Sequence, residues 1–274
     1  MFDWGEVAGA VMGIVNVTPD SFSDGGLYLD PDAAIAHGIA LRDAGAAVLD
    51  VGGESTRPGA AAVSADEEAA RVLPVIRALA TQTSVPVSVD TTKAEVAARA
   101  IEAGATIVND VSAGRLDPEL MGVVADAGAG YVVMHMQGEP RTMQDDPRYD
   151  DVVEEVGAFL VQRLDAARAA GIPDGSLMAD PGIGFGKRPA HNLALLAAVH
   201  LLVERVGVPV LVGASRKTFI GRTLGVDEPA ARDDGTLATV VWALDQGATM
   251  VRVHDVGGAR RAVDLLDALE GAAA

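Results

Sequence analysis

The chain has 274 residues, of which 49% are hydrophobic, and a formal net charge of −18 at pH 7. A negative charge of this size argues against a general affinity for nucleic acid. The chain contains no cysteine, which excludes disulfides, thiolate metal sites and thiol nucleophiles. It shows neither a secretory leader nor an apolar run of membrane-spanning length. We therefore expect a soluble, cytoplasmic protein that does not bind membranes.

A repeated unit runs along the chain: a short apolar run, a loop, and an alanine-rich stretch with helical periodicity. Eight apolar runs are predicted to be strands, at residues 10–17, 47–51, 85–89, 106–108, 130–134, 177–179, 208–212 and 249–253. The helical stretches between them include 32–44, 65–80, 93–103, 151–170, 193–205 and 236–245. Eight alternating units of this total length favour a (β/α)8 TIM barrel, one domain over residues 1–274, over an open doubly wound sheet.

Polar and charged residues gather after the predicted strands, where a barrel of this kind has its active site. The first loop, MGIVNVTPDSFSDGG at residues 12–26, combines Asn16 with the carboxylates Asp20 and Asp24 and the aromatic Phe22. This combination suits a hard cation and a flat organic ligand. The turns that precede the strands consist mostly of Gly, Ala, Thr and Val. This asymmetry between the two ends of the strands predicts an enzyme.

Three hydrogen-bond acceptors stand at the ends of predicted strands: Asp90, Asn109 and Asp180. At one barrel mouth they would form a pocket for the N–H edge of a heterocycle, because buried carboxylates need donors. Two structural interpretations remain open. Asp90 is also placed to cap the helix that begins at Lys93, and Asn109 or Asp180 is placed to accept hydrogen bonds from loop amides.

An anion site is predicted at the last strand. Arg252 and His254 are two residues apart, so their side chains lie on the same side of a strand. An arginine and a histidine that point together suit a phosphate-like anion. Arg57 and a Mg²⁺ ion held by Asn16 would neutralise the same anion further.

The glycines Gly182, Gly184 and Gly186 surround Phe185 in a GxGxG pattern. Their spacing does not match a dinucleotide fingerprint, and the pattern alone is a weak sign of a phosphate cradle. We interpret the glycines as a source of backbone freedom around Phe185.

Several motifs occur in a fixed order over almost the whole chain: MGIVNVTPDSFSDGG, DVGGESTRPG, SVDTTK, NDVS, MHMQGEPRTMQ, DPGIGFGK, GASRKTFIG and RVHDV. In these motifs the chain resembles the dihydropteroate synthases of the folate pathway. The resemblance implies a pterin-binding (β/α)8 barrel that joins 4-aminobenzoate to 6-hydroxymethyl-7,8-dihydropterin diphosphate and releases pyrophosphate and 7,8-dihydropteroate. It also implies Mg²⁺ as cofactor and a homodimer.

The resemblance assigns site residues position by position. The pterin pocket corresponds to Asp90, Asn109, Asp180 and Lys217. The diphosphate site corresponds to Arg57, Arg252 and His254, and the metal site to Asn16 and Asp24. The 4-aminobenzoate site corresponds to Phe22, Thr56, Pro58, Phe185 and Ser215. The catalytic set is expected to be Asp90, Asp180, Lys217, Arg252 and His254.

The residues suggest a dissociative, SN1-like displacement. Mg²⁺, Arg252 and His254 neutralise the diphosphate leaving group, while Asp90 and Asp180 stabilise the positive charge that develops on the pterin. The arylamine is a neutral nucleophile at pH 7 and needs no strong base. We expect the first two loops to close over the diphosphate and to complete the aminobenzoate site, which implies ordered binding.

Three alternatives are weighed against this function. A pterin-binding methyltransferase acting on a corrinoid protein would share the barrel, but would not need the segment 55–58 or the Arg252 and His254 anion site. A sugar-phosphate isomerase or aldolase barrel is disfavoured because Lys217 lacks the apolar strand setting of a Schiff-base lysine. A non-catalytic pterin-binding paralogue is disfavoured because every motif position that would touch diphosphate or metal is filled.

Overall fold

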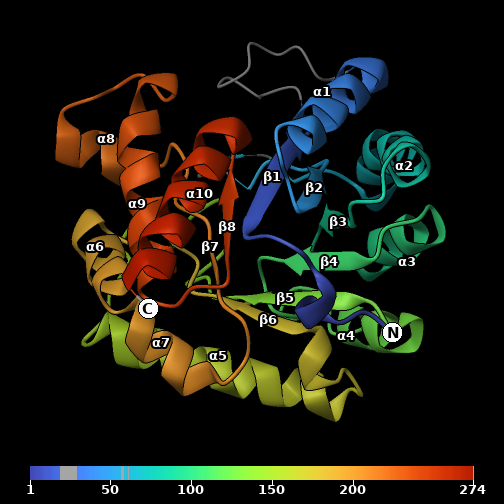
Figure 1. The fold of residues 1–274 in the computed structure, drawn as a ribbon. Helices are drawn as coiled ribbons and strands as arrows, with labels where there is room; N and C mark the ends of the chain where they lie inside the picture. Colours follow the sequence, from blue (N-terminus) through green and yellow to red (C-terminus); the bar gives the residue numbers. More distant parts are fainter. Residues whose placement is uncertain (19–29, 57–58, 61, 274) are drawn as a thin grey trace.

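Eight parallel strands form one sheet with helices around its outside (Figure 1). The computed structural model describes residues 1–18, 30–56, 59–60 and 62–273. The strands are β1 (Val11–Asn16), β2 (Val48–Gly52), β3 (Val87–Asp90), β4 (Ile107–Asp110), β5 (Gly130–Met134), β6 (Leu177–Asp180), β7 (Leu211–Val212) and β8 (Met250–Val253). Each predicted strand overlaps one of these.

The sheet closes on itself. Its hydrogen-bonded order is β6-β5-β4-β3-β2-β1-β8-β7, and a parallel bridge between Ala179 and Val210 joins β6 to the residues just before β7. The amide of Ala179 also donates to the carbonyl of Pro209 at 2.9 Å. The prediction of a (β/α)8 TIM barrel is therefore confirmed.

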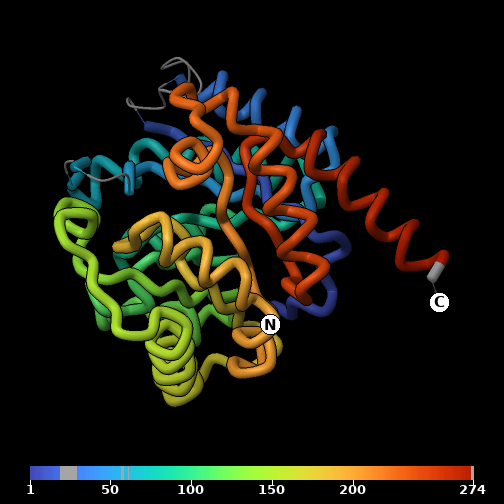
Figure 2. Tube along the Cα trace, turned by 90° about the vertical axis from the view of Figure 1, so that its left-hand side faces the viewer, coloured from blue at the N-terminus to red at the C-terminus, as the bar shows by residue number. Residues whose placement is uncertain are grey.

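The helices cover the outer surface of the barrel in both views (Figures 1 and 2). They are α1 (Pro31–Asp43), α2 (Ala65–Gln82), α3 (Ala94–Glu102), α4 (Leu120–Ala127), α5 (Val152–Ala169), α6 (Pro189–Ala197), α7 (Val199–Val206), α8 (Thr218–Leu224), α9 (Asp233–Asp245) and α10 (Val256–Ala273). Figure 2 shows that the C-terminal part of α10 extends away from the barrel.

Short side-chain caps set the beginnings of the early helices. Asp30 precedes α1 and accepts a hydrogen bond from the amide of Asp32 at 3.0 Å, with Pro31 in the first helical position. Ser64 precedes α2 and accepts from the amide of Glu67 at 3.2 Å. These caps satisfy amides that have no partner within the helix.

The single helix predicted over 193–205 is wrong, because the structure has two helices there. α6 and α7 are separated at Ala198, whose φ of −108° and ψ of 19° are not helical. The buried residues Leu195, Val199 and Leu202 keep a helical spacing across this break. The apolar pattern that predicts one continuous helix therefore carries no sign of the interruption.

The N-terminal half of the barrel interior is an apolar floor. Its buried residues come from every strand except β3 and from a short 3₁₀ turn, η1 (Trp4–Glu6): Trp4, Met12, Val48, Ile107, Val132, Met178, Leu211 and Met250. The indole nitrogen of Trp4 donates to the carbonyl of Ser176 at 3.0 Å. Because this floor fills the interior, polar chemistry is confined to the other end of the strands.

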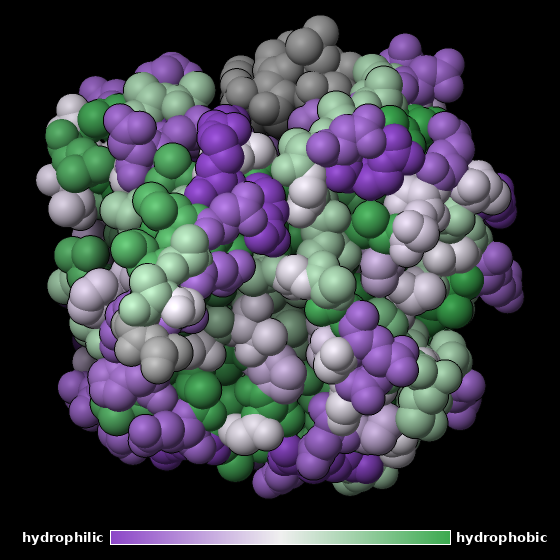
Figure 3. Space-filling model, in the orientation of Figure 1, coloured by the Kyte–Doolittle hydropathy of each residue, from purple (hydrophilic) through white to green (hydrophobic). Residues whose placement is uncertain are grey.

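Hydrophilic and hydrophobic side chains are interspersed over the face in Figure 3. In the part of the chain that the structure describes, no helix has the length and apolar character needed to cross a membrane.

Candidate active site

A polar layer replaces the apolar floor one step further along the strands. Side chains alternate between the two faces of a strand, so the residue two positions after a floor residue also points inward. By this rule four polar residues point inward: Asp50 after Val48, Asn109 after Ile107, Asp180 after Met178 and Arg252 after Met250. Asp90 joins them because it is in register with Asn109 on the neighbouring strand. The inward-facing polar residues therefore lie together at the C-terminal end of the barrel.

Arg252 joins two carboxylates in this layer. Its Nε donates to Asp50 Oδ2 at 2.6 Å, and its Nη2 donates to Asp90 Oδ2 at 2.9 Å. The side-chain amide of Asn109 donates to Asp50 Oδ2 at 3.0 Å. The predicted anion-binding arginine thus also contacts a residue of the predicted pterin pocket.

Asp90 does not cap the following helix, so that interpretation is wrong. The amide of Lys93 donates instead to Thr91 Oγ1 at 3.2 Å, and the amide of Ala94 donates to Asp117 Oδ2 at 2.7 Å. Asp90 is therefore left to face the barrel interior and Arg252.

Burial makes Asp90 a group that titrates near neutral pH. Removal from water raises the pKa of Asp90 to about 7, with nearby Arg252 acting to lower it and Asp50 acting to raise it. For Arg252, burial acts to lower the pKa, but the attraction of Asp50 and Asp90 outweighs it and raises the pKa overall. Arg252 therefore stays charged while Asp90 can change its protonation state.

Asp180 and Lys217 face each other across the space that Gly213 leaves open. A Cβ atom on Gly213 would lie 3.9 Å from Asp180 Oδ2, 4.0 Å from Lys217 Nζ and 3.7 Å from Arg252 Cβ. The other oxygen of Asp180, Oδ1, accepts from the amide of Gly182 at 2.7 Å. The interpretation of Asp180 as an acceptor for a loop amide is confirmed for that oxygen, and Oδ2 points toward the open space.

Lys217 is held against the loop that follows β6. Its Nζ lies 4.6 Å from the ring centroid of Phe185 and donates to the carbonyl of Ile183. Burial lowers the pKa of Lys217 to about 8, and Asp180 opposes this shift. Burial raises the pKa of Asp180, again opposed by Lys217. With a pKa of about 8, Lys217 is an ammonium donor at neutral pH, and the Asp180 side chain beside it offers an acceptor oxygen to a ligand.

Asn16 approaches the same layer from the end of β1. Asn16, Gly52 and Asp90 are in register on three neighbouring strands. A Cβ atom on Gly52 would lie 3.9 Å from Asn16 Oδ1 and 3.8 Å from Asp90 Oδ2. The absence of a side chain at Gly52 therefore keeps open the space between the Asn16 amide and the Asp90 carboxylate.

The described residues include no group of three or more His, Cys, Asp or Glu side chains arranged to hold a metal ion. The amide oxygen of Asn16 is a donor of the type that Mg²⁺ takes, and Mg²⁺ commonly uses few protein ligands together with substrate phosphates. Asn16 therefore fits a magnesium ion that is held largely by a bound diphosphate.

Ser215 and His254 meet at the ends of β7 and β8. Ser215 Oγ lies 2.9 Å from His254 Nδ1, and the amide of His254 donates to Ser215 Oγ at 3.2 Å. The structure thus joins a residue predicted for the aminobenzoate site to one predicted for the diphosphate site. Both contacts place the Ser215 hydroxyl beside the anion site predicted at the last strand.

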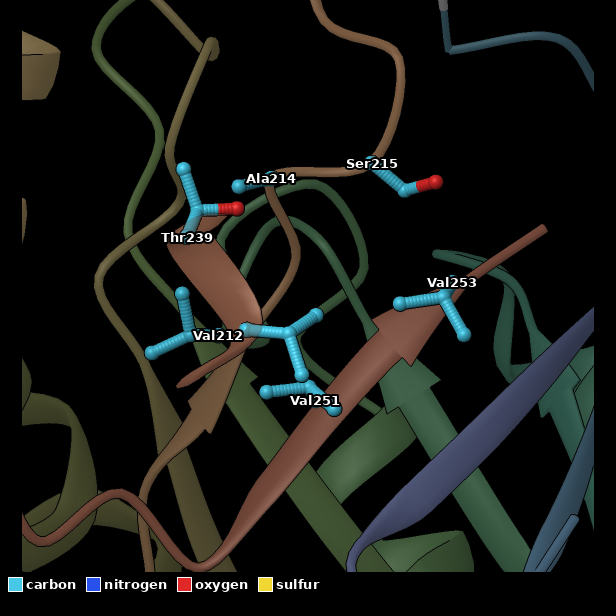
Figure 4. Close-up of a pocket in the computed structure, with 7 residues that line it drawn as sticks. Val212, Ala214, Ser215, Thr239, Val251 and Val253 are labelled. Carbon is cyan, nitrogen blue, oxygen red and sulfur yellow. The ribbon is translucent and has the colours of Figure 1, made fainter. Parts of the chain in front are cut away.

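A small recess lies near these strand ends but on their outer side. Figure 4 shows Val212, Val251 and Val253 lining it beside Thr239 of α9, with Ala214 and Ser215 on the loop above. Apart from the hydroxyls of Ser215 and Thr239, the lining is apolar, so we attribute the recess to the packing between sheet and helix. The inward-facing polar layer is the better candidate for a substrate site.

A lysine in the loop after β3 anchors the loop after β2. Lys93 Nζ forms ion pairs with Glu54 and, at 2.5 Å, with Glu68 of α2. Glu54 Oε1 also accepts from the amide of Val63 at 3.1 Å. These contacts fix the start of the loop that carries Thr56, which is half-buried.

Four residues assigned by the resemblance lie outside the described residues: Phe22, Asp24, Arg57 and Pro58. Their roles in the aminobenzoate, metal and diphosphate sites therefore remain predictions.

Asp50 is a member of the cluster that the sequence analysis missed. It is fully buried within β2, where it bonds Asn109 and Arg252, and its Oδ1 atom has no partner. The sequence does contain a sign of this role: Asp50 interrupts an apolar run, and a buried aspartate in a strand needs a hydrogen-bond donor or a cation.

Lys187 and His135 form a buried pair behind the site. Lys187 Nζ lies 2.8 Å from His135 Nδ1 and donates to the carbonyls of Gly182 at 2.9 Å and Phe185 at 3.0 Å. Burial and the neighbouring Lys187 lower the pKa of His135 to about 2, so the imidazole is neutral. The His135 ring packs edge-on against Phe159 of α5. His135 is therefore part of the support of the β6–α6 loop.

The glycines of that loop serve its backbone shape, as we inferred from the sequence. Gly182, Gly184 and Gly186 have φ values of 66°, 86° and 60°. A Cβ atom on Gly182 would come within 1.8 Å of the His135 carbonyl oxygen. Glycine is therefore required at Gly182 for the close approach of two backbone segments.

A closed (β/α)8 barrel with carboxylates, an amide, a lysine and an arginine at its mouth defines a class of enzyme that binds a polar heterocycle. Residues 12–254 match the family described as pterin binding enzyme, and the chain belongs to this family. It is 50% identical to a dihydropteroate synthase from Mycobacterium leprae over 262 residues, which cover 93% of this chain and 90% of the relative.

Solved structures agree with this family. The dihydropteroate synthase of Xanthomonas albilineans with 4-aminobenzoic acid aligns with a TM-score of 0.88 and 50% identity, over 97% of this chain and 93% of the other. The same enzyme in complex with 7,8-dihydropteroate aligns with a TM-score of 0.85 and 47% identity, over 95% and 93% of the two chains.

Proposed function

We propose that the chain is a dihydropteroate synthase. It joins 4-aminobenzoate to (7,8-dihydropterin-6-yl)methyl diphosphate and releases pyrophosphate and 7,8-dihydropteroate. The observation that carries this proposal is the inward-facing set Asp90, Asn109, Asp180 and Lys217, which offers acceptors and a donor at one barrel mouth. The relatives that bind 4-aminobenzoic acid and 7,8-dihydropteroate share the fold and about half of the sequence.

The pterin is proposed to bind through its polar edges. Asp90 and Asp180 accept hydrogen bonds from ring N–H groups, and Lys217 donates to a ring acceptor. The amide nitrogen of Asn109 already donates to Asp50, so the carbonyl oxygen of Asn109 is turned toward the ligand as a further acceptor. Asp50 thereby fixes which end of the Asn109 amide reads the pterin.

Reaction begins when the bond between the pterin methylene carbon and the diphosphate oxygen breaks. The leaving diphosphate keeps the bonding electrons and is held by Arg252 and His254, with Arg57 as a third cationic group. The positive charge left on the pterin is stabilised by the carboxylates of Asp90 and Asp180. The amino nitrogen of 4-aminobenzoate then bonds to the methylene carbon and loses a proton to solvent.

Magnesium is proposed as the cofactor, with Asn16 and Asp24 as its protein ligands. When bound, the ion supplies positive charge that makes the diphosphate a better leaving group. The chain's own residues supply pterin recognition and charge stabilisation.

The 4-aminobenzoate is proposed to lie beside Phe185, between the β6–α6 and β7–α8 loops, with Thr56 and Ser215 near its carboxylate. Lys217 packs on the Phe185 ring, so the two loops meet where pterin and arylamine must react. Phe22 and Pro58 complete this proposed site.

A product assay separates the proposed function from the methyltransferase alternative. The protein is incubated with the pterin diphosphate, 4-aminobenzoate and Mg²⁺, and the products are analysed by mass spectrometry. When the amino group of 4-aminobenzoate is labelled with ¹⁵N, we expect 7,8-dihydropteroate that carries this label on the nitrogen bonded to the pterin methylene carbon. Methyl transfer from a methylated folate to a corrinoid protein, without formation of dihydropteroate, would overturn the proposal.

We further propose a homodimer. Trp242 of α9 and Leu265 and Leu269 of α10 are 48%, 63% and 60% exposed, and the last two are four residues apart on one helix face. Exposed apolar side chains of this size on adjacent helices suit an interface with a second copy of the chain. Light scattering after gel filtration is expected to give twice the mass of 28.0 kDa, and a monomeric mass would contradict the proposal.

A further inference from the structure

Arg216 has an unusual backbone conformation in the middle of the β7–α8 loop. Its φ is 57°, in the left-handed region, and it stands between Ser215 and Lys217. This conformation is unfavourable for a residue with a side chain, because Cβ comes too close to the following carbonyl oxygen. In the described ranges, the other non-glycine residue with a positive φ is Ala113, at 55°. Such strain persists where surrounding contacts fix it, and it gathers at functional sites.

Residues at the start of α9, and Arg232 just before it, hold Arg216 at three points. The guanidinium forms a bidentate ion pair with Asp233, with Nε 2.8 Å from Oδ1 and Nη2 2.9 Å from Oδ2. The amide of Arg216 donates to Thr236 Oγ1 at 3.0 Å. The carbonyl of Arg216 accepts from Arg232 Nη1 at 2.9 Å. Side chain, amide and carbonyl are thus all fixed by one neighbouring segment.

Because the ion pair is bidentate, it fixes the orientation of the Arg216 side chain. A lysine in place of Arg216 could not form the same two parallel hydrogen bonds. The Arg216 and Asp233 side chains are 14% and 30% exposed, so the pair is partly shielded from water. Thr236, which receives the amide, is buried. These contacts hold Arg216 in the left-handed conformation.

The turn decides where its two neighbours point. On one side Ser215 Oγ meets His254 Nδ1, and on the other Lys217 reaches the Ile183 carbonyl and the Phe185 ring. A reversal of φ at Arg216 would redirect the chain between these two residues. Figure 4 shows Ala214 and Ser215 on the loop next to α9, from which the fixing contacts come.

We propose that Arg216 is a positioning residue: its ion pair with Asp233 locks the left-handed turn that aims Ser215 and Lys217 at the substrates. This inference rests on the proposed function, because Ser215 and Lys217 are assigned to the aminobenzoate and pterin sites. Arg216 acts through its neighbours, and α9 serves as the rigid support of the loop.

The first test is Arg216→Gly. Glycine adopts a φ of 57° without strain, so the variant is expected to fold, but the loop is no longer locked. We expect kcat to fall at least tenfold and the KM for the pterin diphosphate to rise severalfold, with Tm close to that of the wild type. Ala113→Gly is the matched control, because it relieves the same strain and removes no ion pair. Its kcat and KM are expected to stay within twofold of the wild type.

The second variant is Asp233→Asn, which weakens the ion pair from the α9 side. If the lock is the cause, Asp233→Asn reproduces the kinetic change of Arg216→Gly, and the double variant shows no further loss. An Asp233→Asn variant with wild-type kinetics beside a defective Arg216→Gly would overturn the inference, since Arg216 would then act on substrate directly. Wild-type kinetics in both variants would overturn it as well.

Hydrogen exchange of the amides of residues 213–218, without any substrate, provides an independent measurement. Exchange is expected to speed up at least tenfold in Arg216→Gly and Asp233→Asn and to stay unchanged in Ala113→Gly. If the amides exchange equally slowly in the wild type, Arg216→Gly and Asp233→Asn, the proposal that this ion pair fixes the turn would be refuted. If the wild type makes no dihydropteroate while the exchange pattern appears as expected, the proposed function fails and the lock stands.

Discussion

The substitution Asp90→Asn tests the proposed role of a carboxylate in stabilising the pterin cation. Asparagine keeps the shape and one acceptor oxygen but removes the charge. A hydrogen bond to a charged group is worth about 1.5–3 kcal/mol, which corresponds to roughly a 10- to 150-fold change in rate. We expect kcat to fall by about this factor in steady-state assays of pyrophosphate release, while the KM for the pterin diphosphate changes only a few-fold.

The pH dependence gives a second readout of Asp90. The pKa of Asp90 is raised to about 7, so its anion is lost as the pH falls through 7, and the pKa of Lys217 is lowered to about 8, so its charge is lost above 8. The wild-type kcat/KM for the pterin diphosphate is therefore expected to peak between about pH 7 and 8. In Asp90→Asn the fall of kcat/KM at acid pH, called the acid limb below, should no longer occur near pH 7.

Asp110→Asn is the matched control for Asp90→Asn. Asp110 is also buried in this part of the barrel, but it accepts hydrogen bonds from Ser112 Oγ and Tyr131 OH, both at 2.7 Å, instead of facing the substrate. The control is expected to lower Tm and to move the acid limb of kcat/KM much less than Asp90→Asn does, because the Asp110 charge is a minor contribution to the raised pKa of Asp90. An Asp90→Asn enzyme with unchanged kcat and an unshifted acid limb would refute the reasoning.

The remaining predictions concern other contacts. Lys217→Met is expected to raise the KM for the pterin diphosphate at least tenfold; an unchanged KM would remove Lys217 from the pterin site. Arg252→Ala should weaken pyrophosphate binding in calorimetry and lower the free energy of unfolding by about 3–5 kcal/mol, because two buried carboxylates lose their partner. An unchanged pyrophosphate affinity would count against the anion site. Trp4→Ala opens a cavity in the barrel floor and should cost about 3–5 kcal/mol in urea unfolding with kcat unchanged; loss of activity in the folded variant would contradict this separation of floor and site.

The regular parts of the fold follow from local patterns. Apolar runs separated by helical stretches predict the eight strands, and the loops that follow them predict the side of the active site. Period-two alternation then brings Asp90, Asn109 and Asp180 to one interior. These inferences succeed because each depends on residues close together in the chain.

Features that depend on contacts between distant residues escaped the sequence analysis. The ion pair of Arg252 with Asp50 joins residues 202 positions apart, and no local pattern links them. The same holds for Lys187 and His135, which meet only when β5 and β6 pair. The left-handed turn at Arg216 is invisible for a related reason, because Asp233 and Thr236 of α9 impose it on a residue with no preference for that conformation.

The central claim is tested most directly by the release of pyrophosphate from the pterin diphosphate. With the wild-type protein and Mg²⁺, release is expected to depend on added 4-aminobenzoate and to yield one 7,8-dihydropteroate for each pyrophosphate. Absence of release with both substrates present, or release that is the same with and without 4-aminobenzoate, would contradict the account.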